Sequence, residues 1–487
     1  MSVVEPRAAL ADAHVVVAGL GVTGRAVVAA LAGRAARVTT VDAAAPGADL
    51  ADAALVDLAD VDVVVASPGW RPDHPLLAGA LAAGVPVWSE VELAWRLRVD
   101  RAGGRGPAPW LAVTGTNGKT TTVGMLTSIL AAAGERVAEV GNVGTPVVEA
   151  ALDPDVDVLA VELSSFQLHF TWTVSCEAAA VLNLAPDHLD WHGSPERYAA
   201  AKGRIIERAQ RACVYDATDP AVEALVADAD VVEGCRAVGF SLGAPGRSAL
   251  GLVDDLLVDR AFHAAADDPA RHGAADELAT LADLAHLGGE SGAAPHVVAD
   301  ALAAAALARA HGVAAADVRA GLRAYRPGRH RVETVATARV AGGTVRYVDD
   351  SKATNGHAAA ASLASFDAGT VVWVVGGLAK GATFDDLVLR RADRVRAAVV
   401  VGVDATEILG ALERHAPQIP VVRVDPTDTG TVMTRAVEAA AALARPGDTV
   451  LLAPASASMD QFRSYAQRGE DFAAAARAVA ARTTEDD

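Results

Sequence analysis

The chain has 487 residues, of which 52% are hydrophobic and 21% are charged. This length suits about three domains of ordinary size, and the composition excludes an intrinsically disordered chain. Acidic residues outnumber basic ones by 61 to 42, which gives a formal net charge of −19. Because nucleic acids and anionic membranes attract basic surfaces, we expect no nucleic-acid partner. The apolar runs are too short to span a bilayer, so we also expect no membrane insertion.

The cysteines and the N-terminus indicate the compartment. Cys176, Cys213 and Cys235 lack the spacing of a metal site, and a small odd number is typical of reduced thiols. Residues 1–13 contain no basic start followed by an apolar core, so they do not resemble a signal peptide. We therefore expect a cytoplasmic protein.

The N-terminal part of the chain alternates Val-rich runs with Ala- and Leu-rich stretches. The pattern predicts strands at residues 14–18, 38–41, 61–66 and 85–88, with helices at 25–33 and 75–84. Such alternation is typical of a parallel α/β sheet. A segment rich in Gly, Pro and charge follows at residues 101–109, as expected of a linker.

Two further α/β blocks follow this linker. Strands are predicted at residues 110–114, 156–162 and 178–183, and then at 345–349, 370–375, 397–401 and 449–452. Residues 242–294 have no assignable period. The predicted fold class is α/β with three consecutive domains: a Rossmann-like domain at 1–106, a central P-loop domain at 107–328 and a Rossmann-like domain at 329–487.

The first candidate site is the turn Gly19-Leu-Gly-Val-Thr-Gly24, which follows a predicted strand and opens a helix. Asp42 comes 18 residues after Gly24, at the end of the second strand. A dinucleotide-binding turn requires this context, because small residues and a helix N-terminus admit a phosphate. The same pattern fits a different nucleotide, or a tight turn without a ligand.

The second candidate is Thr114-Gly-Thr-Asn-Gly-Lys-Thr-Thr121, between a strand and a predicted helix at 123–133. Lys119 would reach the β- and γ-phosphates of a nucleotide, and the Thr120 hydroxyl would bind Mg²⁺. The motif departs from the standard P-loop, which has glycine at the position of Val113. The residues expected to cradle phosphate are Gly115, Thr116, Asn117, Gly118, Lys119, Thr120 and Thr121.

Two polar clusters lie in the same block. Glu162 ends a strand near the P-loop and is followed by Ser164 and Gln167, which is suitable for Mg²⁺ but also for an ordinary surface carboxylate. Asp187, His188, Asp190 and His192, followed by Lys202, fit no zinc spacing, so Mg²⁺ is the better ion. The alternative here is a turn started by Pro186, with Asp187 as a helix N-cap.

Two motifs in the third block also follow strands. Asp350-Ser-Lys-Ala-Thr-Asn355 carries a lysine and polar groups to a strand end, or else forms a charged loop with a capping Asn. The second motif runs from Ala453 through Ser458, Met459 and Tyr465 to Gly469. Its alternative is a helix start in which Ser458 and Gln461 form a capping box.

In their order, from Gly19 to Gly469, these motifs resemble the ATP-dependent Mur ligases of peptidoglycan synthesis, with folylpolyglutamate synthase as a more distant relative. The loop 114–121 is similar to the shortened P-loop of that superfamily. Within the family, residues 350–355 resemble the member that adds D-glutamate, and residues 458–462 and 162–168 fit the same member. The resemblance implies a ligase that adds D-glutamate to UDP-N-acetylmuramoyl-L-alanine.

The resemblance also implies the chemistry. ATP phosphorylates the substrate carboxylate, the D-glutamate amine attacks the acyl phosphate, and cations must screen the anions. It assigns one Mg²⁺ to Thr120 and Glu162, and a second to His188 and Lys202, the latter carboxylated by CO₂ to a carbamate. Lys119, Lys352 and Arg331 are expected to stabilise the transferring phosphate, and Asp350 and Asp300 to contact the nucleotide.

Substrate residues follow from the same resemblance. The UDP substrate is expected at Val22, Thr23, Asp42, Ser67, Asn142, Ser164 and Gln167. D-Glutamate is expected at Thr354, Lys380, Ser458, Met459 and Tyr465. The third domain would close over ATP, because Lys352 and Lys119 must converge. We expect a monomer.

Three alternatives stay open from the sequence. An NAD-dependent oxidoreductase would use the turn at Gly19 but leave Lys119, Lys202 and residues 350–355 without a role. A sibling ligase would add a different amino acid, or a glutamate tail to folate. A regulator would bind the nucleotide without catalysis.

Overall fold

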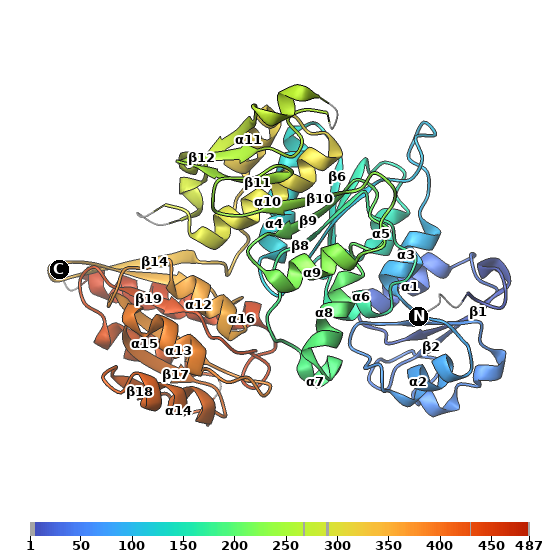
Figure 1. The fold of residues 1–487 in the computed structure, drawn as a ribbon. Helices are drawn as coiled ribbons and strands as arrows, with labels where there is room; N and C mark the ends of the chain where they lie inside the picture. The colour runs from blue at the N-terminus through green and yellow to red at the C-terminus, as the bar shows by residue number, and fades with distance from the viewer. Residues whose placement is uncertain (1–4, 266–267, 289–291, 429, 486–487) are drawn as a thin grey trace. The chain divides into compact units, whose positions relative to one another are not determined.

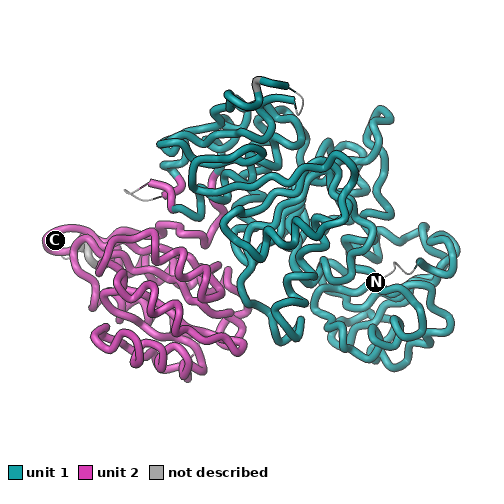
Figure 2. Tube along the Cα trace, in the orientation of Figure 1, with its two compact units in different colours: residues 1–286, 295–325 teal, residues 287–294, 326–487 magenta. Residues whose placement is uncertain are grey.

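The computed structural model describes residues 5–265, 268–288, 292–428 and 430–485. The chain divides into two compact units, residues 1–286 with 295–325, and residues 287–294 with 326–487 (Figure 2). The first unit holds two sheets and the second holds one. Within the described residues, no helix is long and apolar enough to cross a membrane.

The N-terminal sheet, which includes the strands labelled β1 and β2 in Figure 1, is parallel and has the strand order β2-β1-β3-β4. Its Val-rich strands are almost entirely buried, so both faces need helices. The strands are β1 (His14–Ala18), β2 (Arg37–Val41), β3 (Val63–Ala66) and β4 (Val87–Ser89). Helices α1 (Val22–Leu31) and α3 (Glu90–Leu97) cover one face, and α2 (Pro75–Ala82) covers the other. Short 3-10 turns span Leu10–Asp12, Ala53–Leu55 and Leu58–Asp60.

The central sheet has nine strands in the order β13-β12-β11-β10-β9-β8-β5-β7-β6. The strands from β6 to β11 in this order pair in parallel, whereas β12 and β13 are antiparallel additions. Their bounds are β5 (Trp110–Thr114), β6 (Val137–Gly141), β7 (Val158–Glu162), β8 (Ala178–Val181), β9 (Ala212–Asp216), β10 (Arg236–Phe240), β11 (Ala249–Val253), β12 (Leu256–Asp259) and β13 (Asp276–Thr280).

Helices on the central sheet explain its apolar sequence. Helix α10 is Ala-rich and buried on most sides, and it packs against α4 and strands β8 to β10. The helices are α4 (Lys119–Ala132), α5 (Val147–Ala151), α6 (Ser165–His169), α7 (Leu189–His192), α8 (Pro195–Gly203), α9 (Pro220–Asp228), α10 (Pro295–His311) and α11 (Ala315–Ala324), with 3-10 turns at Pro269–His272 and Leu281–Leu287.

The second unit contains a six-stranded sheet of order β14-β15-β19-β16-β17-β18. All neighbours pair in parallel except the hairpin of β14 (Glu333–Val340) and β15 (Gly343–Asp349). The other strands are β16 (Val371–Gly376), β17 (Val395–Val401), β18 (Val421–Arg423) and β19 (Thr449–Leu452). Helices α12 (Gly356–Leu363), α13 (Asp385–Arg391) and α14 (Thr406–His415) cover one face, and α15 (Val432–Leu443) and α16 (Tyr465–Glu485) cover the other. A 3-10 turn spans Ala392–Arg394.

The predicted α/β class is confirmed, and the strands expected at 14–18, 110–114 and 449–452 have the predicted bounds. The aperiodic segment 242–294 contains β11, β12 and β13, apart from residues 266–267 and 289–291, which lie outside the described ones. Each sheet lies within one of the three predicted domain ranges. The boundaries after residues 106 and 328 stay predictions.

Candidate active site

The loop between β5 and α4 is shaped by its neighbours. Gly118 has φ +83°, and a Cβ atom there would lie 2.3 Å from Oδ1 of Asp300 on α10. Both conditions favour glycine. The Lys119 ammonium folds back and donates hydrogen bonds to the carbonyl oxygens of Gly115 (2.8 Å) and Thr116 (3.0 Å). An ammonium and the amides at the start of α4, including those of Thr120 and Thr121, thus lie together, which suits a phosphate.

Asn183, which follows β8, holds this loop from the side. Its Oδ1 accepts from the Asn117 amide at 2.9 Å, and its Nδ2 donates to the Asn117 carbonyl at 3.2 Å. The Thr116 hydroxyl lies 3.0 Å from the Tyr198 hydroxyl. The sequence analysis assigned no role to Asn183 or Tyr198. The available signal was that Asn183 follows a strand adjacent to the P-loop strand.

Lys202 lies beneath the loop and is only 2% exposed. Its Nζ donates to the Gly115 carbonyl at 2.8 Å and lies 3.4 Å from the Thr114 hydroxyl. Burial and the nearby Lys119 charge lower the pKa of Lys202 well below its ordinary value, against the opposing effects of Asp187 and Glu162. Lys119 and Lys202 therefore share one carbonyl, and Lys202 loses its proton more readily than an exposed lysine does.

Glu162 ends β7 beside the P-loop strand and is buried. Asn142 donates from Nδ2 to Glu162 Oε1 at 2.7 Å and from its backbone amide to the Glu162 carbonyl at 2.8 Å. Ser164, two residues after Glu162, forms a reciprocal capping box with Gln167 at the start of α6. These predicted substrate residues therefore also have structural roles: Asn142 orients the carboxylate, and the other two begin a helix.

His188 occupies the N-cap position of α7 with φ +53°. Its backbone amide donates to Asp187 Oδ1 at 2.9 Å, and its ring lies 4.6 Å from that of Phe166 between centroids. Asp187 is therefore not the N-cap that the alternative interpretation required. His192 is nearby and buried, and burial, with the charges of His169, His188 and Lys202, lowers its pKa to about 4.

The carboxyl edge of the N-terminal sheet brings Gly19, Asp42 and Ser67 together. Asp42 accepts from the amides of Leu20 (2.7 Å) and Ala44 (2.8 Å), and these bonds lower its pKa. Ser67 donates to the Gly19 carbonyl at 3.1 Å. A cavity of about 530 Å³ opens beside this edge, with Val41, Val56, Leu58, Trp70 and His74 among its lining residues. Val22 and Thr23 begin α1 at the same turn, and the Val22 side chain is 65% exposed.

In the second unit, the end of β15 and the loop after it bring several predicted residues together. Asp350 is buried, and its burial raises the pKa to about 6, opposed by the nearby Ser362 hydroxyl and the Arg331 charge. The Lys352 ammonium lies 4.0 Å above the centre of the Tyr465 ring. Thr354 is half-buried two residues further on, and Asn355 caps α12 by accepting from the Ala358 amide at 2.9 Å. The capping Asn355 of the alternative interpretation is therefore present in the structure.

Two more loops follow β16 and β19 in this unit. Lys380 is exposed with φ +52°, Met459 is 65% exposed, and Ser458 is buried. Backbone hydrogen bonds of 2.9 and 3.1 Å between Leu378 and Ala457 tie these loops together. The alternative interpretation of this segment, a helix start at Ser458, is wrong, because residues 458–463 form a turn and α16 begins at Tyr465. The Gln461 side chain instead accepts from the Gly402 amide at 2.8 Å.

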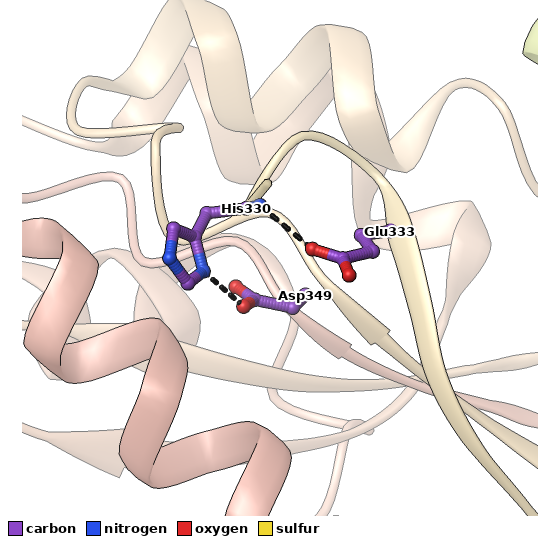
Figure 3. Close-up of side chains that lie close together, drawn as sticks. All are labelled: His330, Glu333 and Asp349. Atoms are coloured by element: carbon purple, nitrogen blue, oxygen red, sulfur yellow. Dashed lines mark hydrogen bonds and ion pairs between the residues drawn. The ribbon is translucent and has the colours of Figure 1, made fainter. Parts of the chain in front are cut away.

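His330, Glu333 and Asp349 lie close together in the same unit (Figure 3). Nδ1 of His330 lies 2.6 Å from Asp349 Oδ2, and the His330 amide donates to Glu333 Oε2 at 3.0 Å. A Cβ atom on Gly469 would lie 2.3 Å from His330 Nδ1. Because the ring and the carboxylate bond each other directly, the group is better described as a packed hydrogen-bonded cluster than as a metal site.

Comparison with known proteins identifies the family. The model of the Mur ligase middle domain matches residues 113–251, and that of the Mur ligase, glutamate ligase domain, matches residues 330–456. The UDP-N-acetylmuramoylalanine–D-glutamate ligase of Streptomyces coelicolor is 56% identical over 483 residues, covering 96% of this chain and 98% of the relative. The protein of that name from Thermobifida fusca is 52% identical over 486 residues, with the same coverage. The chain belongs to the Mur ligase family.

Solved structures share the Mur ligase fold. The UDP-N-acetylmuramate–alanine ligase MurC of Thermotoga maritima is similar with a TM-score of 0.55 and 17% identity, covering 96% of this chain and 99% of that one. MurF of Acinetobacter baumannii gives a TM-score of 0.54 and 17% identity, covering 95% and 91%. Family membership also removes the NAD-dependent oxidoreductase as an explanation of the turn at Gly19.

This Mur ligase has an unusual distribution of basic residues. Of its 42 basic residues only four are lysines, and all four stand at predicted site positions: Lys119, Lys202, Lys352 and Lys380. A lysine ammonium is a compact point charge that loses its proton when buried, whereas a guanidinium is a planar, permanently charged fork. The four positions are therefore the ones where this chain carries an amine instead of a guanidinium.

Proposed function

We propose that this Mur ligase is an ATP-dependent enzyme that adds D-glutamate to UDP-N-acetylmuramoyl-L-alanine through an acyl phosphate. The observation that carries the proposal is the similarity along nearly the whole chain to relatives bearing that name. The geometry supports the chemistry, since a P-loop, two lysines and a held carboxylate lie together at one sheet edge.

Lys119 is the main residue in the first step, the phosphorylation of the substrate carboxylate. Phosphorylation brings a carboxylate against the γ-phosphate, so two anions meet and must be screened. The Lys119 ammonium and the amides at the N-terminus of α4 do this for the phosphates. Asp300, which lies against Gly118, would accept from the adenine amino group, and in the second unit Arg331 and Lys352 would add positive charge.

The donor set at the P-loop fits Mg²⁺. The Thr120 hydroxyl and the Glu162 carboxylate are hard oxygen ligands, and Asn142 orients that carboxylate at 2.7 Å. Mg²⁺ would supply charge neutralisation at the phosphates. We propose a second ion near His188 and Lys202, for which a protonated Lys202 is unsuitable. Once its ammonium has lost a proton, the amine can form an N–C bond with CO₂ and release a second proton, which leaves an anionic carbamate where a cation stood.

Substrate binding is proposed at two further places. The cavity of about 530 Å³ beside Asp42 would take the uridine part of the substrate, with Trp70 and His74 as its aromatic wall. The turn at Gly19, with Val22, Thr23 and Ser67, would take the pyrophosphate, and Asn142, Ser164 and Gln167 the sugar side. D-Glutamate would bind at Thr354, Lys380, Ser458, Met459 and Tyr465, where Lys380 would hold a carboxylate.

These sites define the division of labour that we propose. Residues 1–106 bind the UDP substrate, residues 107–328 bind ATP, and residues 329–487 bind D-glutamate and close over ATP. We further propose that the enzyme works as a monomer in the cytoplasm.

The test is phosphate release from ATP and Mg²⁺ in the presence of UDP-N-acetylmuramoyl-L-alanine. D-Glutamate is compared with L-glutamate, L-alanine, L-lysine and meso-diaminopimelate. Release that requires both the UDP substrate and D-glutamate supports the proposal. Release with another amino acid indicates a sibling ligase, and no release from folded protein rejects both.

A further inference from the structure

The guanidinium of Arg468 lies beneath the loops that carry the proposed D-glutamate residues. Arg468 is in the first turn of α16 and is only 1% exposed. Its Nε donates to the Ser351 hydroxyl at 3.0 Å, its Nη2 to the Ser351 carbonyl at 2.9 Å, and its Nη1 to the Ser456 carbonyl at 3.0 Å. One side chain thus joins the loop after β15 to the loop after β19.

The third loop touches the same group. A Cβ atom on Gly377, which follows β16, would lie 3.3 Å from Arg468 Nη1 and 2.4 Å from the Ala457 carbonyl oxygen. The Gly377 backbone therefore packs closely on the guanidinium. Lys352 follows Ser351 directly, Ser458 comes two residues after Ser456, and Lys380 comes three residues after Gly377. Each loop in contact with Arg468 carries one of the proposed substrate or phosphate residues.

The first turn of α16 adds further contacts to the loop after β15. The Ser351 hydroxyl donates to the Tyr465 carbonyl at 2.7 Å, and the Lys352 ammonium lies above the Tyr465 ring. Gly469 packs against the His330–Asp349 pair, so close that a Cβ atom would not fit. Residues 465–469 therefore contact the segment at Asp349, Ser351 and Lys352.

The partners of Arg468 indicate why an arginine is there. Burying a charge is costly unless its hydrogen bonds are satisfied, and these three go to a hydroxyl and to two carbonyls. Burial lowers the pKa of Arg468 to about 10, so it keeps its charge at neutral pH. The planar guanidinium can donate hydrogen bonds to two loops at fixed angles, whereas a lysine ammonium cannot reproduce that geometry.

We propose that Arg468 is a positioning residue of the ligase reaction, which clamps the three loops so that Lys352, Lys380 and Ser458 face D-glutamate and phosphate together. This inference rests on the proposed function for the identity of the substrates. The clamp itself rests on the hydrogen bonds above.

The test compares Arg468→Lys with Arg309→Lys. Arg309 is a matched control, because it is also largely buried but bonds Asp259 at 2.8 Å and Asp276 at 2.6 Å in the other unit. For Arg468→Lys we expect kcat to fall and KM for D-glutamate to rise, each by about tenfold, with KM for the UDP substrate unchanged. Arg309→Lys should alter neither. Ser351→Ala removes the hydroxyl that accepts from Arg468 and donates to Tyr465, but keeps the Ser351 carbonyl as an acceptor, so it should give a weaker effect of the same kind.

Hydrogen exchange gives a readout that does not depend on turnover. The Asp350 amide bonds the Leu452 carbonyl at 2.9 Å, and the Phe462 amide bonds the Ser458 carbonyl at 2.8 Å. Both amides should exchange about tenfold faster in Arg468→Lys than in the Arg309→Lys control. Unchanged exchange together with an unchanged KM for D-glutamate overturns the inference. If the wild type shows no turnover that depends on D-glutamate, the proposed function is overturned instead. The hydrogen-exchange rates of the two amides then still test whether Arg468 holds the loops together.

Discussion

Removing the Lys119 ammonium should disable ATP use without unfolding the protein. The structure holds this group at 2.8 Å from the Gly115 carbonyl and 3.0 Å from the Thr116 carbonyl, within the loop that we propose to bind phosphate. A phosphate charge about 4 Å away, at an effective dielectric constant of about 20, interacts by about 4 kcal/mol. That energy corresponds to a loss of about a thousandfold in kcat/KM for ATP.

Lys119→Ala is assayed by phosphate release with the UDP substrate and D-glutamate saturating. The matched control is Lys380→Ala, which removes an exposed lysine and should raise KM for D-glutamate while leaving KM for ATP unchanged. Loss of the two loop hydrogen bonds should lower the unfolding free energy by only about 1–3 kcal/mol. A folded Lys119→Ala enzyme with kcat/KM for ATP within tenfold of wild type would refute the P-loop assignment.

The remaining predictions concern the loop glycine, the buried amine and a buried acid. Gly118→Ala should lose ATP-dependent turnover, because φ is +83° and the new Cβ would meet Asp300; Gly134→Ala, with φ +88° and open space, is the control and should keep its turnover. With ¹³C-bicarbonate, NMR should show a carbamate signal that Lys202→Arg abolishes, and only three other lysines compete; an unaltered signal in the variant would reject the carbamate. Burial raises the pKa of Glu90 from 4.5 to about 7, so the folded state keeps a proton that the unfolded chain releases between these pH values. The unfolding free energy should therefore fall across this window by up to about 3 kcal/mol. Glu90→Gln should flatten the fall in urea titrations at several pH values, and an equally steep fall would contradict the assignment.

Much of the site was predictable because its signals are local. A strand, a Gly-rich turn and a helix in sequence predict a phosphate-binding loop, and the strands at 14–18 and 110–114 have the predicted bounds. Parallel strands bring their carboxyl ends to one edge, which is why Glu162 could be expected beside the P-loop. The capping role of Asn355 depends on a side chain and an amide three residues away, and it was found for the same reason.

The features that the sequence did not predict depend on contacts between residues far apart in the chain, or on irregular patterns. Residues 242–294 contain an antiparallel addition to the sheet, in which β12 pairs β11 and β13, without a clean alternation to predict it. The Ser458 segment has the composition of a capping box, but Gln461 bonds Gly402 across the fold and the segment forms a turn. The capping-box pattern failed there because Gln461 hydrogen-bonds to a residue far away in the chain.

The sequence by itself determined which groups are present and where each loop falls relative to a strand. It determined the α/β class, the P-loop and the four lysines, because these depend on residue type and short spacing. Only the tertiary structure decided that Lys119 and Lys202 share the Gly115 carbonyl, and that Arg468 joins Ser351 to Ser456. The physical reason is that desolvation and hydrogen-bond geometry are properties of surroundings, and residues far apart in the chain supply those surroundings only after folding.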